Sequence, residues 1–283
     1  MDPKQFISRS NARGFIAVAR DLIAIGATIA ICIAADHWVI TVLGIWIIGF
    51  FQFTLGEILT HEASHWNLFA TRRLNDHAEL ILTLPFFFTL ADYRREHIEH
   101  HQLLSTRKEQ LYHDYDYLGL MSENVNWVWI WFIRPIVGYA GLFYLRSLIE
   151  ISAARSWLKI GIFWLFVIAA AIATNTWHYL ILYWIVPILW SYSSFFYWSE
   201  IEDHFNTRTG TRSNIGSMNL LIHNSGFHHT HHQYPTIPWY NLRMAHNRLT
   251  KHQSDESKGF FDTFKQISTP KKDAVGAYPP PES

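Results

Sequence analysis

Histidine is frequent in this chain and is concentrated in three short stretches. The 283 residues include 17 histidines. The three stretches read His61-Glu62-Ala63-Ser64-His65, His97-Ile98-Glu99-His100-His101 and His228-His229-Thr230-His231-His232. The neutral imidazole ring is a common metal ligand. Histidines concentrated in this way indicate a metal site, whereas packing is the simpler explanation for a lone residue such as His37.

The spacing inside each stretch suits metal binding from a helix. Residues four apart lie on one helical face, so His97 and His101 can reach the same ion. His100 is turned by about 100° from His101 and can reach a second point. The first stretch repeats the four-residue spacing, and the third repeats the whole HxxHH pattern. The eight histidines that fit are His61, His65, His97, His100, His101, His228, His231 and His232. Together they are enough for two metal ions.

Composition argues against several other kinds of site and binding partner. Cys32 is the single cysteine, so the sequence offers neither a disulfide framework nor a thiolate metal site. Formal net charge is zero and no block of like charges occurs, so nothing predicts binding to nucleic acid. Any metal ion must therefore be held by histidine or carboxylate.

The elements that must position these histidines are predicted to be membrane helices. Hydrophobic residues make up 49% of the chain and charged residues only 16%, against about 25% charged in ordinary soluble domains. Four apolar segments have the length needed to cross a bilayer, which takes about 20 helical residues. They are roughly residues 15–35, 38–59, 157–173 and 178–198. Short connections at 36–37 and 174–177 join them into two hairpins.

Two other apolar stretches are not expected to cross. Residues 80–91 are too few, so this stretch is predicted to be re-entrant or peripheral. Residues 127–149 are interrupted by Arg134, Pro135 and Arg146, and their tryptophan-rich start suits the membrane interface. If neither stretch crosses, an even number of spans separates each histidine stretch from the next. All three stretches then lie on the same side of the membrane, as a single site requires.

The distribution of positive charge predicts the orientation. Neither hairpin tip carries Lys or Arg, whereas the segments on the opposite side carry many, and such residues mark the cytosolic face. Both termini and the histidine stretches should be cytosolic. The predicted fold class is all-α: an integral membrane protein with four transmembrane helices in two hairpins, interfacial helices and a cytosolic histidine-rich cap. Residues 1–250 form the membrane domain, and 251–283 are predicted to be a polar, flexible tail apart from a short stretch at 260–267.

The first stretch, taken alone, permits a different enzyme class. His61-Glu62-xx-His65 is also the HExxH pattern of zinc peptidases, in which Glu62 would be the general base. Such a peptidase needs three protein ligands and a water, fewer than the histidines present here. A non-enzymatic metal sensor or transporter is disfavoured because the histidines lie outside the predicted spans.

The stretches and their surroundings resemble the membrane fatty acid desaturase and hydroxylase superfamily, which also includes carotenoid ketolases. The resemblance covers roughly residues 15–250. It rests on the three histidine boxes, on Tyr93-Arg94 leading into the second box, and on Pro238-Trp239-Tyr240-Asn241-Leu242 after the third. It implies four spans, a cytosolic cap and a non-haem di-iron centre with one further histidine ligand. His204 stands at the matching position and is the ninth candidate metal ligand.

Residues outside the boxes are candidates to support the ligands. A ligating imidazole usually donates its other N–H to a carboxylate or carbonyl. Glu57 lies four residues before His61, on the same helical face and near the membrane boundary, where a bare carboxylate is expected to have a functional partner. Asp203 stands where many relatives have Glu and is another candidate. Asn224 is a candidate water-mediated ligand. Further carboxylates near in sequence are Glu96, Glu99 and Glu200.

The resemblance implies that two Fe ions, with O2 as co-substrate, desaturate the fatty acyl chain of a lipid. The sequence has no GxGxxG, P-loop or haem motif, and no His-Pro-Gly-Gly signature of a fused cytochrome b5 domain. Electrons are therefore expected from a separate donor of the ferredoxin or cytochrome b5 type. A hydroxylase or carotenoid ketolase on the same scaffold remains open, because one centre can support either outcome.

Overall fold

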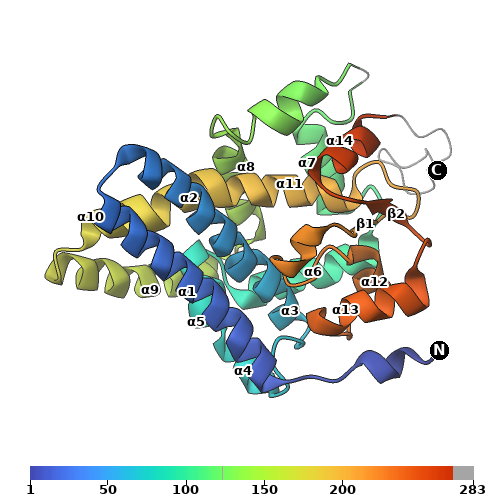
Figure 1. Ribbon diagram of the computed structural model, residues 1–283, viewed down its shortest axis with the longest axis horizontal. Coiled ribbons are helices and arrows are strands. Elements are labelled where there is room, and N and C mark those ends of the chain that lie inside the picture. Colours follow the sequence, from blue (N-terminus) through green and yellow to red (C-terminus); the bar gives the residue numbers. More distant parts are fainter. Residues whose placement is uncertain (123, 270–283) are drawn as a thin grey trace. The chain divides into compact units, whose positions relative to one another are not determined.

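The computed structural model describes residues 1–122 and 124–269, which are mainly helical with very little strand (Figure 1). In chain order, the elements up to the second histidine stretch are η1 (Pro3–Phe6), α1 (Asn11–Ala35), α2 (Trp38–Phe53), η2 (Thr54–Ile58), α3 (Leu59–Ser64), α4 (Arg72–His77), α5 (Glu79–Leu82), η3 (Leu84–Phe86) and α6 (Leu90–Leu103). The middle of the chain contains α7 (Gln110–Tyr117), η4 (Trp129–Ile133), α8 (Tyr139–Ile151), α9 (Ala154–Ala173), α10 (Trp177–Leu180), η5 (Ile181–Ile185), η6 (Ile188–Tyr192) and α11 (Ser193–His204). The rest contains β1 (Arg212–Asn214), η7 (Ser217–Leu220), α12 (His228–Gln233), α13 (Trp239–Ala245), η8 (His246–Thr250), β2 (Asp255–Ser257) and α14 (Phe260–Ser268).

The chain folds into two compact units, which we name by composition. The hydrophobic unit comprises Ser10–Arg95 and Arg134–Tyr197. The histidine-rich unit comprises Met1–Arg9, Glu96–Ile133 and Trp198–Ser283.

Four continuous helical stretches are long and apolar enough to cross a membrane. They are Asn11–Ala35, Trp38–Ser64, Ala154–Ala173 and Trp177–His204. Their outward side chains are apolar: Ile23 of α1 is 69% exposed and Phe166 of α9 is 71% exposed. Such surfaces are stable against lipid and not against water. The predicted all-α fold class with four membrane helices is confirmed, and the helix limits agree with the predicted spans to within a few residues.

The connections that form the two hairpins are as short as predicted. Asp36 ends α1 in the left-handed conformation with φ of 42°, and its N–H donates to Cys32 O at 3.2 Å. The Nδ1 atom of His37 then accepts a hydrogen bond from Val39 N at 3.3 Å and caps α2. At the second tip, the hydroxyls of Thr174 and Thr176 are 2.8 Å apart. Figure 1 shows α1 and α2 packed as an antiparallel pair.

A close backbone approach packs α2 against η6. A Cβ atom added at Gly49 would collide with Ser191 Oγ and lie 2.6 Å from Tyr192 N, so only glycine fits there. The Ser191 hydroxyl also donates to Ile45 O at 2.7 Å. Small residues and hydroxyl groups are the usual means of close helix packing inside membranes.

The two stretches predicted not to cross form short, broken elements. Residues 80–91 contain the end of α5, the 3-10 turn η3 and the start of α6, and Leu84 and Phe86 are buried. Trp164 Nε1 donates to Leu84 O at 3.1 Å, which holds this stretch against α9. Residues 127–149 are divided between η4 and α8.

The part of the polar C-terminal segment that the structure describes has regular structure. Residues 255–257 form β2, which pairs in parallel with β1 so that Glu256 lies opposite Ser213. Helix α14 follows, and Asn206 Nδ2 donates to Ile267 O at 3.2 Å and Thr269 O at 2.8 Å. Residues 255–259 were predicted to be flexible and residues 260–267 to be a short exception; both are folded within the histidine-rich unit. The remainder of that segment, 270–283, lies outside the described residues.

Candidate metal centre

In the histidine-rich unit, three helices bring seven of the nine candidate ligands together. Helix α6 carries the second box, α12 carries the third, and α11 ends at His204. The outer face of α12 is anchored by Thr230, whose hydroxyl lies 3.2 Å from His246 Nδ1 and 2.6 Å from Thr250 Oγ1. The end of α11 is held by Arg212, which donates to Phe205 O at 2.9 Å and to Glu202 O.

Four of these histidines form a group, which we call the four-histidine group. Its members are His100, His204, His228 and His232, whose ligand nitrogens all lie within 4.8 Å of one another. The Nε2 atom of His228 is 2.9 Å from that of His204 and 3.0 Å from that of His232. The Nε2 atoms of His100 and His232 are 3.3 Å apart.

This arrangement fits a metal ion better than hydrogen bonding. A neutral imidazole has one N–H, so four Nε2 atoms facing one another cannot all be satisfied by donating to each other. Nitrogen ligands about 2.1 Å from one ion lie roughly 3 Å apart at ordinary coordination angles. The observed separations match that spacing. Burial and the neighbouring His228 ring also hold the pKa of His232 well below its usual range, so that ring is neutral and its lone pair is available.

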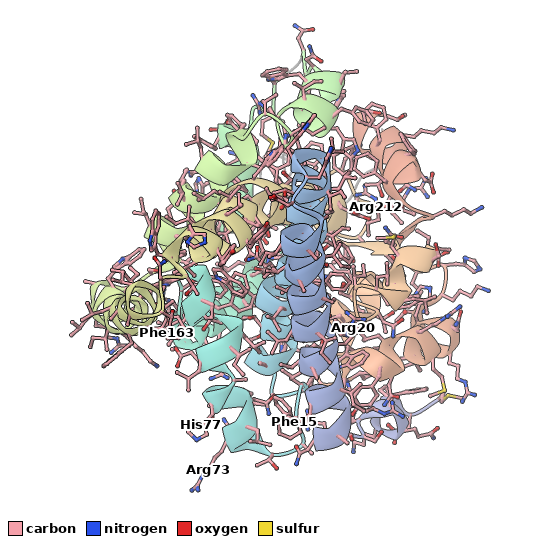
Figure 2. All side chains as sticks on the ribbon, turned by 60° about the vertical axis from the view of Figure 1, so that its left-hand side comes forward. Phe15, Arg20, Arg73, His77, Phe163 and Arg212 are labelled. Carbon is pink, nitrogen blue, oxygen red and sulfur yellow. The ribbon has the colours of Figure 1, made fainter. Side chains whose placement is uncertain are left out.

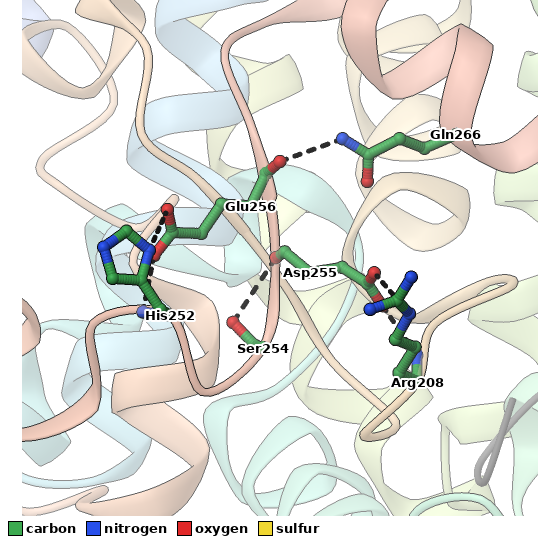
Figure 3. Close-up of a pocket in the computed structure, with 6 residues that line it drawn as sticks. All are labelled: Arg208, His252, Ser254, Asp255, Glu256 and Gln266. Atoms are coloured by element: carbon green, nitrogen blue, oxygen red, sulfur yellow. Dashed lines mark hydrogen bonds and ion pairs between the residues drawn. The ribbon is translucent and has the colours of Figure 1, made fainter. Parts of the chain in front are cut away.

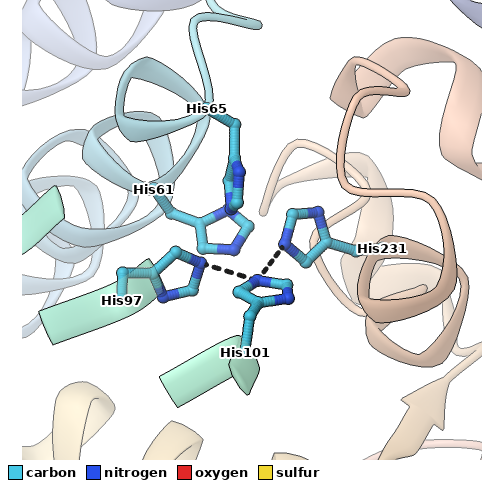
Figure 4. A group of neighbouring side chains, drawn as sticks. All are labelled: His61, His65, His97, His101 and His231. Carbon is cyan, nitrogen blue, oxygen red and sulfur yellow. Dashed lines mark hydrogen bonds between the residues drawn. The ribbon is translucent and has the colours of Figure 1, made fainter. Parts of the chain in front are cut away.

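A second set, which we call the three-histidine group, consists of His97, His101 and His231. Figure 4 shows the two rings from α6 and the ring from α12 turned toward one another. The Nε2 atom of His101 lies 3.0 Å from that of His97 and 3.1 Å from that of His231. The same spacing argument applies, so this set can supply three ligands to an ion.

In the hydrophobic unit, α3 carries the first box. The rings of His61 and His65 have centroids 5.3 Å apart, and their ligand atoms lie within 4.8 Å of each other, as the four-residue spacing predicted. His61 Nδ1 lies 3.6 Å from Glu62 Oε1. Both rings are also drawn in Figure 4. His65 directly follows the last residue of α3, and the two rings lie close enough for one ion to bind both.

The sequence as a whole matches a known family model over most of its length. The model is described as fatty acid desaturase and matches residues 36–264. The chain belongs to the fatty acid desaturase family. The enzymes of this family are non-haem di-iron oxidoreductases of the desaturase, hydroxylase and ketolase type. With its four apolar helices, this family member is an integral membrane protein. Family membership favours oxidation over the peptidase alternative that the HExxH pattern had left open.

Two curated proteins are similar to this desaturase family member. One is named dihydrorhizobitoxine desaturase, from Bradyrhizobium elkanii, with 28% identity over 83% of this chain and 74% of the relative. The other is named beta-carotene ketolase, from Paracoccus sp. (strain N81106 / MBIC 01143), with 25% identity over 65% of this chain and 71% of the relative. The two names cover both outcomes that the sequence had left open.

Partners for the outer ring nitrogens of this family member lie in the same unit. His100 Nδ1 is 2.5 Å from Glu109 Oε1, and His204 Nδ1 is 2.8 Å from Gly210 O. Glu109 is buried, and its other oxygen accepts from Ser105 N at 2.8 Å. Sequence reasoning missed Glu109, because it lies nine residues from His100 and follows a loop. The one local feature that could have pointed to Glu109 is its position just before helix α7.

The carboxylates that were expected to support the ligands have different surroundings. Asp203 Oδ2 lies 3.9 Å from His228 Nδ1, a long ion-pair distance. Glu57 accepts a hydrogen bond from Tyr93 Oη at 2.8 Å. Glu99, beside His100 in sequence, is exposed.

Three other polar residues lie in or near the third box in the sequence. His229 Nδ1 lies 2.6 Å from Thr211 Oγ1. His223 packs against Trp239 with ring centroids 5.0 Å apart. Neither belongs to the groups above. Asn224 follows His223, and both have positive φ, 51° and 56°. Two consecutive non-glycine residues in this conformation mark a constrained turn just before α12.

A surface pocket in the histidine-rich unit does not suit a hydrocarbon. Its volume is about 430 Å³, and every residue that lines it is polar or charged: Arg208, His252, Ser254, Asp255, Glu256 and Gln266 (Figure 3). Sites for apolar ligands are lined mainly by apolar side chains. We therefore assign the lipid substrate no place in this pocket.

Proposed function

We propose that this protein is a membrane-bound di-iron oxidase that uses O2 to introduce a double bond into the fatty acyl chain of a lipid. The proposed iron ligands are His61, His65, His97, His100, His101, His204, His228, His231 and His232. The reaction takes two hydrogens from the acyl chain and two electrons and two protons from outside, and it reduces O2 to two molecules of water. A ferredoxin or cytochrome b5 type donor would supply the electrons.

The observation that carries the proposal is the convergence of the four-histidine group. Its Nε2 atoms meet at 2.9–3.3 Å, and the ligand set is imidazole alone. Imidazole suits iron, and the family is a di-iron class. When bound, two irons would supply the activation of O2 that removal of hydrogen from an unactivated C–H bond requires.

The chain's own residues would orient the ligands and limit access of water. Glu109 and the Gly210 carbonyl fix which nitrogen of His100 and His204 faces inward, because each accepts the N–H of the outer nitrogen. His204, His228 and His231 are buried. Burial of the ligand rings protects the site from unproductive reaction with solvent. Asp203 is proposed to assist His228, and Asn224 is proposed as a water-mediated ligand.

A second candidate function has a specific observation in its favour. The relative named beta-carotene ketolase supports a hydroxylase or carotenoid ketolase reaction on the same ligands. Desaturation removes a second hydrogen, whereas these reactions insert oxygen. The ligand set is compatible with both.

The decisive experiment is expression in a host that lacks these activities, followed by mass analysis of its lipids and pigments. We expect acyl chains that have lost two hydrogens, and none in a host that expresses His231→Ala. Oxygenated pigments with unchanged acyl chains would favour the ketolase instead. Metal analysis of the purified protein accompanies it, with about two irons per chain expected. Stoichiometric zinc without iron in an active sample would refute the di-iron proposal.

A further inference from the structure

The helix that carries the first histidine box ends in an unusual conformation. Trp66, directly after His65, has φ of +54°. Its N–H donates to Ala63 O at 3.1 Å, and Asn67 N donates to Glu62 O at 2.8 Å. Helix ends with such a left-handed residue usually have glycine there, because a Cβ atom is strained in this conformation. The surrounding structure must therefore hold Trp66 in place.

Two guanidinium groups and a carboxylate hold the Trp66 side chain. The Cζ atoms of Arg72 and Arg94 each lie 4.1 Å from the ring centroid, within the range of a cation–π contact. The indole Nε1 donates to Asp76 Oδ1 at 3.2 Å. The side chains of these four residues thus form one cluster, which we call the Trp66 clamp.

Arg94 also binds the end of the box helix directly. Its Nε donates to Ser64 O at 3.0 Å, and its Nη2 donates to Ala63 O at 3.3 Å and to Asp76 Oδ1 at 2.9 Å. The last carbonyl groups of a helix have no partner within the helix. Arg94 therefore supplies hydrogen-bond donors to the carbonyl groups at the C-terminus of α3. His61 lies before these carbonyl groups and His65 lies after them.

The preceding residue binds the same helical segment one turn before the box. Tyr93 Oη donates to Glu57 Oε1 at 2.8 Å, and Glu57 is four residues before His61. Tyr93 and Arg94 are both in the first turn and a half of α6, which continues to His97. Two adjacent residues of α6 thus bind the first-box segment, Tyr93 one turn before His61 and Arg94 at the carbonyl groups between His61 and His65.

We propose that Arg94, acting through the Trp66 clamp, is a positioning residue that fixes the orientation of His65 and His61 for metal binding. This inference rests on the proposed function only in taking these two histidines as metal ligands. The planar guanidinium is required because it donates to two carbonyls and a carboxylate while stacking on the indole, which an ammonium group cannot do.

The test uses the full-length protein in lipid nanodiscs, stripped of metal and titrated with cobalt(II). The absorption bands of bound cobalt report the number and geometry of its ligands. The variants are Arg94→Gln and Arg94→Lys. The matched control is Arg95→Gln, since Arg95 carries the same charge on the same helix but donates to Asp92 Oδ1 at 3.0 Å and Ile151 O at 2.6 Å. Trp66→Asn is added because asparagine tolerates a positive φ but removes the ring.

We expect both Arg94 variants and Trp66→Asn to bind one of two cobalt ions at least about tenfold more weakly, with altered absorption bands. Arg95→Gln should bind as the wild type does. A wild-type titration and spectrum in Arg94→Gln would overturn the proposal. Full recovery in Arg94→Lys would do so too, because charge alone would then suffice. If Arg94→Gln does not fold, Arg94→Lys and Trp66→Asn are tested instead. Weaker binding of one cobalt ion in both would support the proposal, and wild-type binding in both would overturn it.

Failure of this inference differs from failure of the proposed function. Cobalt binding needs neither O2 nor a lipid. A wild-type protein that oxidises no lipid, together with weaker cobalt binding in the Arg94 variants, would contradict the function and support the clamp. If the wild-type protein oxidises lipid and Arg94→Gln binds cobalt as the wild type does, only the clamp would be contradicted.

Discussion

At the scale of single residues, the carboxylate that contacts the candidate ligand His100 is not the one nearest to it in sequence. Glu99 is the neighbour of His100 along the chain, yet it is exposed. Glu109 is nine positions away and lies 2.5 Å from His100 Nδ1. On a helix, adjacent residues point about 100° apart, so the neighbour of an inward ligand does not face the same site.

This difference gives a direct comparison of two glutamates. We expect Glu109→Gln to lower iron retention or activity about 10- to 100-fold, because the buried carboxylate that orients His100 is replaced by a neutral amide. Glu99→Gln should retain wild-type iron. The measurement is iron per protein after dialysis against graded chelator. Equal iron loss in both variants would mean that total negative charge, and not the Glu109 contact, matters.

At the scale of elements, hydrophobic length predicted the four spans, but local packing determined how they approach one another. Two glycines illustrate this. Gly49 of α2 is in tight contact with Ser191 and Tyr192, whereas Gly26 of α1 has open space where a Cβ atom would be. Both are glycines inside apolar helices, and nothing in the adjacent sequence distinguishes them.

The two positions should respond oppositely to alanine. Gly49→Ala is expected to destabilise the protein by about 1–3 kcal/mol, because the added methyl group forces α2 and η6 apart. Gly26→Ala should be neutral or stabilise by up to about 1 kcal/mol, because alanine favours the helix and meets no neighbour. Thermal unfolding in one detergent would measure both. A loss of stability in Gly26→Ala as large as that in Gly49→Ala would contradict the packing explanation.

At the scale of the whole molecule, the orientation in the membrane remains a prediction from charge. The Arg-rich segments include Arg73, which points outward from α4 with His77 in Figure 2. The hairpin tips at 36–37 and 174–176 carry no Lys or Arg. If positive residues mark the cytosolic face, both termini and all three histidine boxes are cytosolic.

The single cysteine makes this orientation testable. In a Cys32→Ser background, Asn175→Cys at a hairpin tip and Lys108→Cys after the second box are compared in intact cells with a membrane-impermeant maleimide. We expect labelling at 175 from outside and labelling at 108 only after the cells are opened. The reverse pattern would place the histidine boxes outside the cytosol and contradict the charge rule here.

The sequence by itself determined the spans, the hairpins and the spacing of the candidate ligands within each box, because these depend on helical spacing and on the length of apolar segments. His61 in α3 and His65 directly after its end lie close together for that reason. The sequence could not show that Glu109 and Gly210 hold the outer nitrogens of His100 and His204, that residues 255–268 fold onto the histidine-rich unit, or that Arg94 completes α3. Each of these depends on segments far apart along the chain coming into contact, and the energy of such contacts leaves no periodic pattern in the local sequence.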